Sequence, residues 1–394
     1  MLGDWQSVID EFKAVVPAVD FWSLRLVHDE YETLRVRDGV VQPPNLTQSR
    51  GVHISLMDGA GMTYAATSAL TRNGLRIAVE KALDWLAFSR RHALFDSRHL
   101  PRPQQSGSYA TPVQIPWEAW SLHDKIQQLQ DINCVLDIDA AIVDRQAELA
   151  RRQSGVTLVT SDGVEINQQF NYVIPGYVAV ANKGAQTQAR SGGGWGSALQ
   201  GGLEQLASFD FPHSARQVAE QALALVDAPE CPDTRADVLL MPSQMMLQIH
   251  ESIGHPLEVD RILGDERKYA GTSFVSLDMF GSYRYGSELL NITFDPGIEQ
   301  EIASYAFDDD GTPAEKTYLI RNGILERPLG GAVSRTRAGM NGVASARACD
   351  WNRPAIDRMA NLNLEPGSSN LGELIASIEY GVLMETNRSW SIDD

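Results

Sequence analysis

Cysteine is scarce in this chain of 394 residues, which has only Cys134, Cys231 and Cys349, at isolated positions. No two of them form a C-x-x-C pair, so the usage is typical of a cytosolic protein and argues against a disulfide framework. Apolar runs of transmembrane length are also missing, and the first residues have neither the basic nor the apolar region of a secretory signal. These absences predict a cytoplasmic protein that does not associate with a membrane.

Positive charge is in short supply as well. The sequence has 33 lysines and arginines against 51 aspartates and glutamates, which gives a formal net charge of −18. A nucleic-acid surface needs clustered basic side chains for its phosphate contacts, so we expect no nucleic-acid partner. The length leaves room for two or three domains, each with a core of its own.

The most informative stretch is His250-Glu251-Ser252-Ile253-Gly254-His255. The preceding Asp237–Met241 predicts a short buried strand, and Ser243 is a plausible N-cap for a helix that carries the motif. Two imidazoles and a carboxylate on one helix, among acidic and apolar neighbours, are typical of a divalent-metal hydrolytic site. Two nearby histidines can also be unrelated surface or core residues, so the motif alone leaves both interpretations open.

The spacing of the histidines departs from the familiar zinc-protease pattern H-E-x-x-H. A spacing of four leaves the two side chains about 40° apart on a regular helix, whereas the spacing of five in this H-E-x-x-x-H motif separates them by about 140°. Both can bind one metal only if the helix bulges or stops between them. Gly254, with Pro256 after His255, could supply that break.

The motif and the P-L-E-x-D that follows, residues His250–Asp260, resemble the signature of the TldD/PmbA metallopeptidase family, formerly labelled modulators of DNA gyrase. The resemblance implies a zinc-dependent peptidase that cleaves unfolded or short peptides. It implies that His250 and His255 bind the metal and that Glu251 acts on the metal-bound water. It also implies a homodimer, or a heterodimer with a related member, that encloses the sites in a cavity.

The third zinc ligand of that family is a cysteine in a C-terminal Cys-Gly-Lys segment, and this sequence contains no Cys-Gly pair. Family members continue past the stretch that resembles Thr386–Asp394, so we expect a truncated chain whose third ligand lies beyond residue 394. Cys349 is the other candidate for the third ligand, but it lies in Ser345–Pro354, which resembles a different, non-ligating part of the family. Glu258 or Asp260 could hold an imidazole tautomer, or they could be helix-terminal charges.

The overall pattern predicts an α+β fold: an N-terminal α/β domain with a linker (1–112), a middle α+β domain (113–230), and a β-rich C-terminal domain (231–394) that carries the metal-binding helix. Alternating apolar residues predict separate short strands in the first domain, with turns at Gly51 and Gly59. The other ranges that bear on the fold are a linker over Leu100–Pro116, a helical patch over Ala140–Arg152, and strands over Val164–Tyr172 and Tyr177–Ala181.

Three further segments have competing interpretations. The glycine-rich Ser191–Gly202 lacks the lysine and hydroxyl of a phosphate-binding loop, which favours a mobile loop, although Arg190 and Trp195 could face a peptide there. Asp308–Gly311 lacks the spacing of a calcium loop, which favours a solvated hairpin turn. The arginines of Ser334–Arg353 could line the cleft and bind a peptide carboxylate or backbone carbonyls, or they could form surface pairs.

We therefore expect a metallopeptidase in which the metal polarises the scissile carbonyl and Glu251 is the general base. Two other classes of function remain. The first is a non-catalytic binding protein that modulates a topoisomerase or a toxin–antitoxin partner, and such a protein has no need of Glu251. The second is another metallohydrolase, such as an amidase acting on a non-peptide substrate.

Overall fold

A computed structural model describes residues 5–387, apart from the side chain of Pro212. The fold is α+β, as predicted: long strands dominate the first 230 residues, and short strands and helices make up the rest. Most of the stretch Thr386–Asp394, which resembles the middle of a sheet in the family, lies outside the described residues. No helix between residues 5 and 387 combines the length and the apolar character needed to cross a bilayer.

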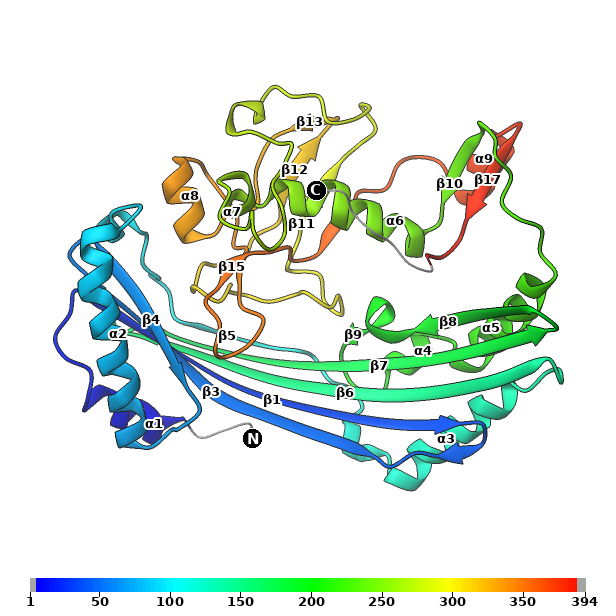
Figure 1. Cartoon of the computed structure of the whole chain (residues 1–394), viewed down its shortest axis with the longest axis horizontal. Coiled ribbons are helices and arrows are strands. Elements are labelled where there is room, and N and C mark those ends of the chain that lie inside the picture. Colours follow the sequence, from blue (N-terminus) through cyan, green and yellow to red (C-terminus); the bar gives the residue numbers. More distant parts are fainter. Residues whose placement is uncertain (1–4, 388–394) are drawn as a thin grey trace.

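One curved sheet runs through the N-terminal 230 residues (Figure 1). Its main order is β4-β3-β1-β6-β7-β5, and all of these neighbours are antiparallel except the parallel pair β5–β7. The strands of this path are β1 (Phe21–Arg37), β3 (Asn45–Asp58), β4 (Gly61–Thr67), β5 (Gly107–Ala110), β6 (Ile142–Thr160) and β7 (Glu165–Lys183). The short β2 (Val40–Val41) pairs with β1, and β8 (Gln186–Gly193) and β9 (Leu199–Gln200) pair with β7.

Several strands are longer than the sequence predicts. The helical prediction for Ala140–Arg152 is wrong, because this stretch forms the first half of β6. Its good helix formers favoured a helix, but pairing with β1 on one side and β7 on the other overrides that preference. The predicted linker contains β5, and Gly51, predicted in a turn, is paired with Val27 inside β3. The turn at Gly59 is confirmed, with φ +57°.

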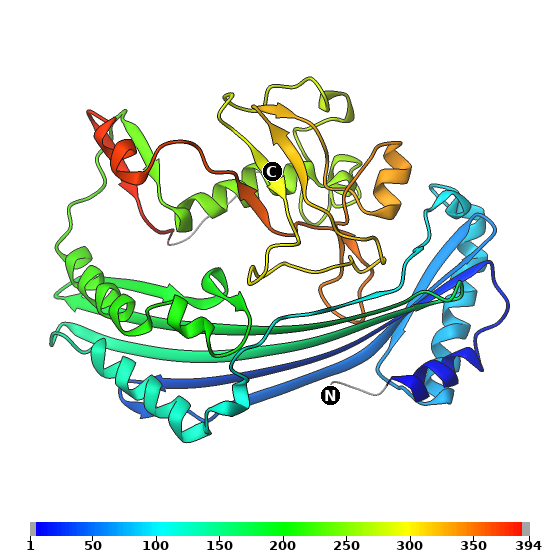
Figure 2. The ribbon, with the colours of Figure 1, turned by 180° about the vertical axis from the view of Figure 1, so that it is seen from behind.

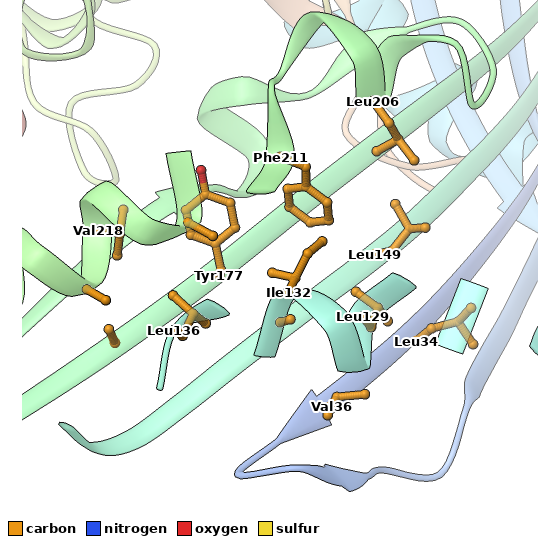
Figure 3. Close-up of a cluster of buried hydrophobic side chains, with 14 of the residues drawn as sticks. Leu34, Val36, Leu129, Ile132, Leu136, Leu149, Tyr177, Leu206, Phe211 and Val218 are labelled. Carbon is orange, nitrogen blue, oxygen red and sulfur yellow. The ribbon is translucent and has the colours of Figure 1, made fainter. Parts of the chain in front are cut away.

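Strand alternation divides the sheet into a helix-covered face and an inner face. The helix-covered face packs at one end against α1 (Gln6–Lys13) and α2 (Arg72–His92). At the other end it packs against α3 (Leu122–Val135), α4 (Gln205–Ser208) and α5 (Phe211–Val226), and Figure 3 shows Leu34, Leu149 and Tyr177 of the strands meeting residues of these helices. Since neighbouring residues point to opposite faces, the sheet also presents a second surface.

That second, inner face is covered by the C-terminal part of the chain, which lies inside the curve of the sheet (Figures 1 and 2). Its core surrounds a four-stranded sheet of order β13-β12-β11-β16. The strands of this part are β10 (Asp237–Leu240), β11 (Ile292–Phe294), β12 (Thr317–Arg321), β13 (Ile324–Leu325), β14 (Ala346–Arg347), β15 (Ile356–Asp357), β16 (Leu362–Leu364) and β17 (Gly381–Met384). Its α-helices are α6 (Pro242–Ile249), α7 (Val259–Ile262), α8 (Ala332–Ala338) and α9 (Leu371–Ala376).

Two predicted loops are more ordered than expected. Ser191–Gly202 contains the end of β8, a 3-10 turn over Gly194–Ser197 and β9. Asp308–Gly311 is a turn, as predicted, but Asp308 is buried rather than solvated. Its carboxylate accepts hydrogen bonds from backbone N–H groups, among them that of Ala346 at 3.1 Å. The remaining 3-10 turns are Ser97–His99, Trp117–Ala119, His255–Leu257 and Leu277–Met279.

Candidate metal centre

The helix that carries the histidine motif changes its winding at the motif. After α6 the chain continues as one π turn over His250–Gly254 and then as a 3-10 turn over His255–Leu257. The N–H of His255 donates to the carbonyl oxygen of His250, which is the i→i+5 hydrogen bond of a π turn. Such a turn accommodates one extra residue, so a spacing of five returns His255 to the side of the helix that carries His250. The structure therefore contains the bulge that the spacing requires.

The beginning of this helix differs from the prediction. Met241 rather than Ser243 is the N-cap residue, and Pro242 occupies the first helical position, where its missing N–H costs no hydrogen bond. The hydroxyl of Ser243 instead donates to the carbonyl oxygen of Glu385. This bond ties the start of α6 to the segment after β17, and β17 itself pairs in parallel with β10, the strand that precedes the helix.

The π turn brings together three groups that can hold a metal ion. One ligand atom each from His250, Glu251 and His255 lies within 4.8 Å of the other two. The two imidazole rings have their centroids 4.6 Å apart, with planes at 88°. Glu251 Oε2 is 4.0 Å from His255 Nε2. His250 is exposed, whereas Glu251 and His255 are half-buried. Desolvation of its ring by the surrounding protein atoms and the neighbouring His255 lower the pKa of His250, which favours the neutral imidazole that a metal requires.

A buried carboxylate fixes the orientation of the second histidine. Glu258 Oε2 lies 3.0 Å from His255 Nδ1, and Glu258 is fully buried. The same oxygen is 3.4 Å from Nε of Arg261 and 3.3 Å from Nη1 of Arg358, so its charge is compensated. A hydrogen on Nδ1 donated to Glu258 leaves the lone pair of Nε2 available toward Glu251 and His250.

Of the two acidic residues proposed to support an imidazole, only Glu258 does so. The carboxylate of Asp260 instead accepts from the backbone N–H groups of Arg261 (2.7 Å) and Asp357 (3.1 Å). Asp357 returns the interaction by accepting from the N–H of Asp260 at 3.0 Å. This reciprocal pair joins α7 to β15, and its role is therefore in holding the scaffold behind the histidines.

Gly254 is the last residue of the π turn, where the sequence predicts a break, and it also has a packing role. Its backbone is helical (φ −58°, ψ −67°). An added Cβ would lie 1.9 Å from the sulfur of Met359, which is far inside the contact distance. Glycine is therefore needed at this position because Met359 packs directly on the π turn.

A cavity of about 830 Å³ lies beside the two histidines. Its wall includes Tyr64 of β4, so the N-terminal sheet and the C-terminal part enclose it together. Cys349 also lines it and is exposed, but its sulfur does not belong to the group of ligand atoms within 4.8 Å. The substitute ligand considered from the sequence is thus near the site without joining the cluster.

The arginine-rich stretch divides between two locations. Arg347 and Arg353 line the cavity beside the histidines, as one of the two interpretations predicts. Arg337 pairs with Asp265 instead, as the other interpretation predicts. Arg358, just outside the stretch considered, also lines the cavity. Neither Arg358 nor Tyr64 was singled out in the sequence, because neither carries a local motif.

Trp195 is half exposed, at 47%, and its ring contacts those of Tyr31 and Tyr172 at centroid distances of 6.2 and 6.4 Å. The next residue, Gly196, lies close to Met246 of α6: a Cβ at that glycine would be 3.2 Å from the Met246 methyl group. The glycine-rich segment thus lies close to the helix that leads into the candidate metal centre.

Comparisons with known proteins agree with this arrangement along the chain. Three family models match: PmbA/TldA metallopeptidase domain 1 over residues 22–86, the central domain over 115–226 and the C-terminal domain over 233–393. A metalloprotease of Methanocaldococcus jannaschii is 22% identical, over 98% of this chain and 82% of that protein. A metalloprotease TldD homolog of Buchnera aphidicola is 24% identical, over 92% of this chain and 74% of that protein. In fold, a Thermotoga maritima protein solved as a candidate modulator of a DNA gyrase matches with a TM-score of 0.75 at 16% identity, over 98% of this chain and 83% of that one.

Proposed function

Because this chain belongs to the PmbA/TldD family and is a metallopeptidase, we propose that His250 and His255 bind its catalytic metal and that Glu251 is its general base. We further propose that the metal is zinc and that the substrates are unfolded or short peptides. The observation that carries the proposal is the π turn, which gathers the ligand atoms of these three residues within 4.8 Å.

The donor set suits the proposed ion. Imidazole nitrogens are common zinc ligands, and Glu258 on Nδ1 of His255 is the kind of buried partner that raises the basicity of a ligating histidine. When bound, zinc supplies Lewis acidity toward a carbonyl oxygen and lowers the pKa of a bound water. A third protein ligand is expected for a catalytic zinc. We leave Cys349 out of the ligand set, since its sulfur is not in the cluster.

The side chains of the site have distinct tasks in this proposal. Glu251, half-buried beside both histidines, accepts the proton of the attacking water and delivers it to the leaving amine. Glu258 keeps the His255 ring in one tautomer and orientation. The cavity beside the histidines receives the peptide, with one wall from the N-terminal sheet and the other from the C-terminal part.

A homodimer, or a heterodimer with a related family member, is the assembly we propose for the active form. This assembly follows from the family resemblance alone. Size-exclusion chromatography with light scattering on the chain alone, and after co-expression with a related member, measures it directly. If the protein is a monomer under both conditions and still cleaves peptides, the proposal is contradicted.

The deciding experiment compares Glu251→Gln with the parent chain on a peptide library, with the metal content measured by mass spectrometry. We expect Glu251→Gln to retain the metal and to lose peptide cleavage, while His250→Ala loses both. If Glu251→Gln keeps full turnover, Glu251 is not the base. If the metal-loaded parent cleaves no peptide but hydrolyses small amides, the substrate class is wrong. If it does neither, a binding protein that modulates another macromolecule becomes the better hypothesis.

A further inference from the structure

The cavity beside the histidines is lined by more positive than negative side chains, whereas the molecule as a whole is acidic. The chain has 18 more acidic than basic residues, yet the Arg, Lys, Asp and Glu side chains lining this cavity are three arginines, Arg347, Arg353 and Arg358, and one acid, Glu266. Glu266 lies 3.8 Å from Nη2 of Arg358, so that acid is already compensated. A concave surface with an excess of positive charge in an acidic protein attracts and retains anionic groups.

The three arginines differ in how many hydrogen bonds and ion pairs their side chains form within the protein. Arg358 is committed, because it contacts Glu258, Glu266 and the carbonyl oxygen of Asp357. Arg347 donates from Nη1 to the carbonyl oxygen of Met359 at 2.7 Å. The guanidinium of Arg353 makes no hydrogen bond or ion pair with any residue in the described range 5–387. Within residues 5–387, Arg353 is thus the arginine of this wall whose side chain is not already used in a hydrogen bond or an ion pair.

Although its side chain is free, the backbone of Arg353 is held from the inner face of the sheet. Arg25, which is 4% exposed, donates from Nη2 to the carbonyl oxygens of Asp350 (3.3 Å) and Arg353 (2.6 Å). In the same segment the indole N–H of Trp351 donates to the hydroxyl of Ser49 at 3.0 Å, and its ring packs on Gly51. Because the backbone that carries this guanidinium is already held in place, less conformational entropy is lost when the side chain binds an anion.

We propose that Arg353, assisted by Arg347, binds a carboxylate of the peptide substrate in this cavity, so that peptides with a carboxylate close to the scissile bond are preferred. The inference rests on the proposed function and names its substrate class. The carboxylate comes either from an acidic side chain or from a free C-terminus. Both have the planar shape that a guanidinium binds through two parallel hydrogen bonds.

The test uses three versions of one peptide that the parent chain cleaves: an amidated neutral peptide, the amidated peptide with a glutamate near the scissile bond, and the neutral peptide with a free C-terminus. We expect Arg353→Gln to lower kcat/KM about 10- to 100-fold for a carboxylate-bearing version, as for a lost charged hydrogen bond, and less than twofold for the amidated neutral peptide. Whether the glutamate or the free C-terminal version responds identifies the source of the carboxylate.

Two variants serve as controls. Arg353→Lys keeps the charge but loses the paired hydrogen bonds, so it should recover part of the preference. Arg91→Gln removes an exposed arginine of α2 that does not line the cavity, and it should leave all three peptides unchanged. An equal loss on the three peptides in Arg353→Gln, or no loss on any of them, would overturn the proposal.

A binding measurement separates this inference from the proposed function. Fluorescence anisotropy of the three labelled peptides on zinc-loaded Glu251→Gln reports recognition without turnover. Tighter binding of a carboxylate-bearing peptide, abolished by adding Arg353→Gln, supports the inference even if the parent chain cleaves nothing. Equal binding of the three peptides, or no binding of any of them, contradicts the inference even if cleavage is established.

Discussion

His255 Nδ1 lies 3.0 Å from Glu258 Oε2, and Glu258 is shielded completely from solvent. The two residues are only three positions apart in the chain, yet their contact connects the cluster of candidate ligands to the buried Arg261 and the half-buried Arg358. The orientation of the ligand is thus determined by a charge network inside the protein rather than by the helix alone.

Replacing Glu258 by glutamine should therefore weaken metal binding and stability together. The variant loses the charge that compensates Arg261 and Arg358, and breaking a buried ion pair from one side typically costs about 3–5 kcal/mol. We expect zinc affinity to fall about 10- to 100-fold, as for other lost partners of ligating histidines. Competition with a chromogenic chelator and urea denaturation measure the two effects. Glu80→Gln, which breaks an exposed pair with Arg76, is the control and should change neither.

Glu251→Gln should separate catalysis from metal binding. Glutamine has nearly the same size and hydrogen-bonding capacity but cannot accept the proton of water, so we expect peptide cleavage to fall roughly 10²- to 10⁴-fold. The metal content and the melting temperature should stay close to those of the parent chain. Loss of metal in this variant would instead indicate that the carboxylate is itself a ligand.

Gly254→Ala should disturb the π turn through contact with Met359. The new Cβ would lie 1.9 Å from the Met359 sulfur, and overpacking of this kind costs about 1–3 kcal/mol of folding free energy. Zinc affinity should fall because His250 and His255 lie at the two ends of the displaced turn. Met359→Ala in the same chain removes the clash and should restore affinity, whereas Gly367→Ala, where no atom lies within 4 Å of the new Cβ, should be silent.

Gly51→Ala should act on the cavity from a distance. An added Cβ would lie 2.2 Å from Cδ2 of Trp351, so the segment that carries Arg353 must shift. We expect a stability loss of about 1–3 kcal/mol and a higher KM for carboxylate-bearing peptides, with zinc affinity unchanged. If zinc affinity falls as much as in Gly254→Ala, the effect is a general loss of structure.

The reciprocal pair of Asp260 and Asp357 should make stability depend on pH. Burial and the neighbouring carboxyl raise the pKa of Asp260 to about 8, against about 4 in an unfolded chain. The folded state therefore holds a proton that the unfolded state releases, so the stabilisation is complete below about pH 4 and is lost as pH rises toward 8. Urea denaturation at pH 5 and pH 8 should show a loss on the order of 1–3 kcal/mol. Asp260→Asn should flatten this dependence, while Asp84→Asn, on the exposed side of α2, should not.

The candidate site was predictable where its chemistry is local. His250, Glu251 and His255 are adjacent in sequence, and the geometry of a regular helix shows that a spacing of five needs a bulge. The π turn is that bulge, and its last residue, Gly254, is also required for packing on Met359. Glu258 could be named as a partner of an imidazole, but local sequence did not distinguish it from Asp260.

The presence of strands was predictable where alternation is clear, as in the N-terminal domain, and the fold was misassigned where helix-forming residues occupy a strand. Ala140–Arg152 is a strand because β1 and β7 supply hydrogen-bonding partners on both of its sides, and those partners come from distant parts of the chain. Local preference is worth little against ladders of hydrogen bonds with two neighbouring strands, which β7 forms from Ile142 and β1 from Gln146 onward.

The sequence by itself determined the class of fold, the residues able to bind a metal and the helix bulge that their spacing requires, because each depends on a few neighbouring residues. Only the tertiary structure decided which arginines line the cavity beside the histidines and which of them already form ion pairs. Arg353 is held in place by Arg25, more than 300 residues away along the chain, and Tyr64 reaches the same cavity from the opposite sheet. Such contacts arise when the C-terminal part packs inside the curved sheet, and no local pattern encodes that packing.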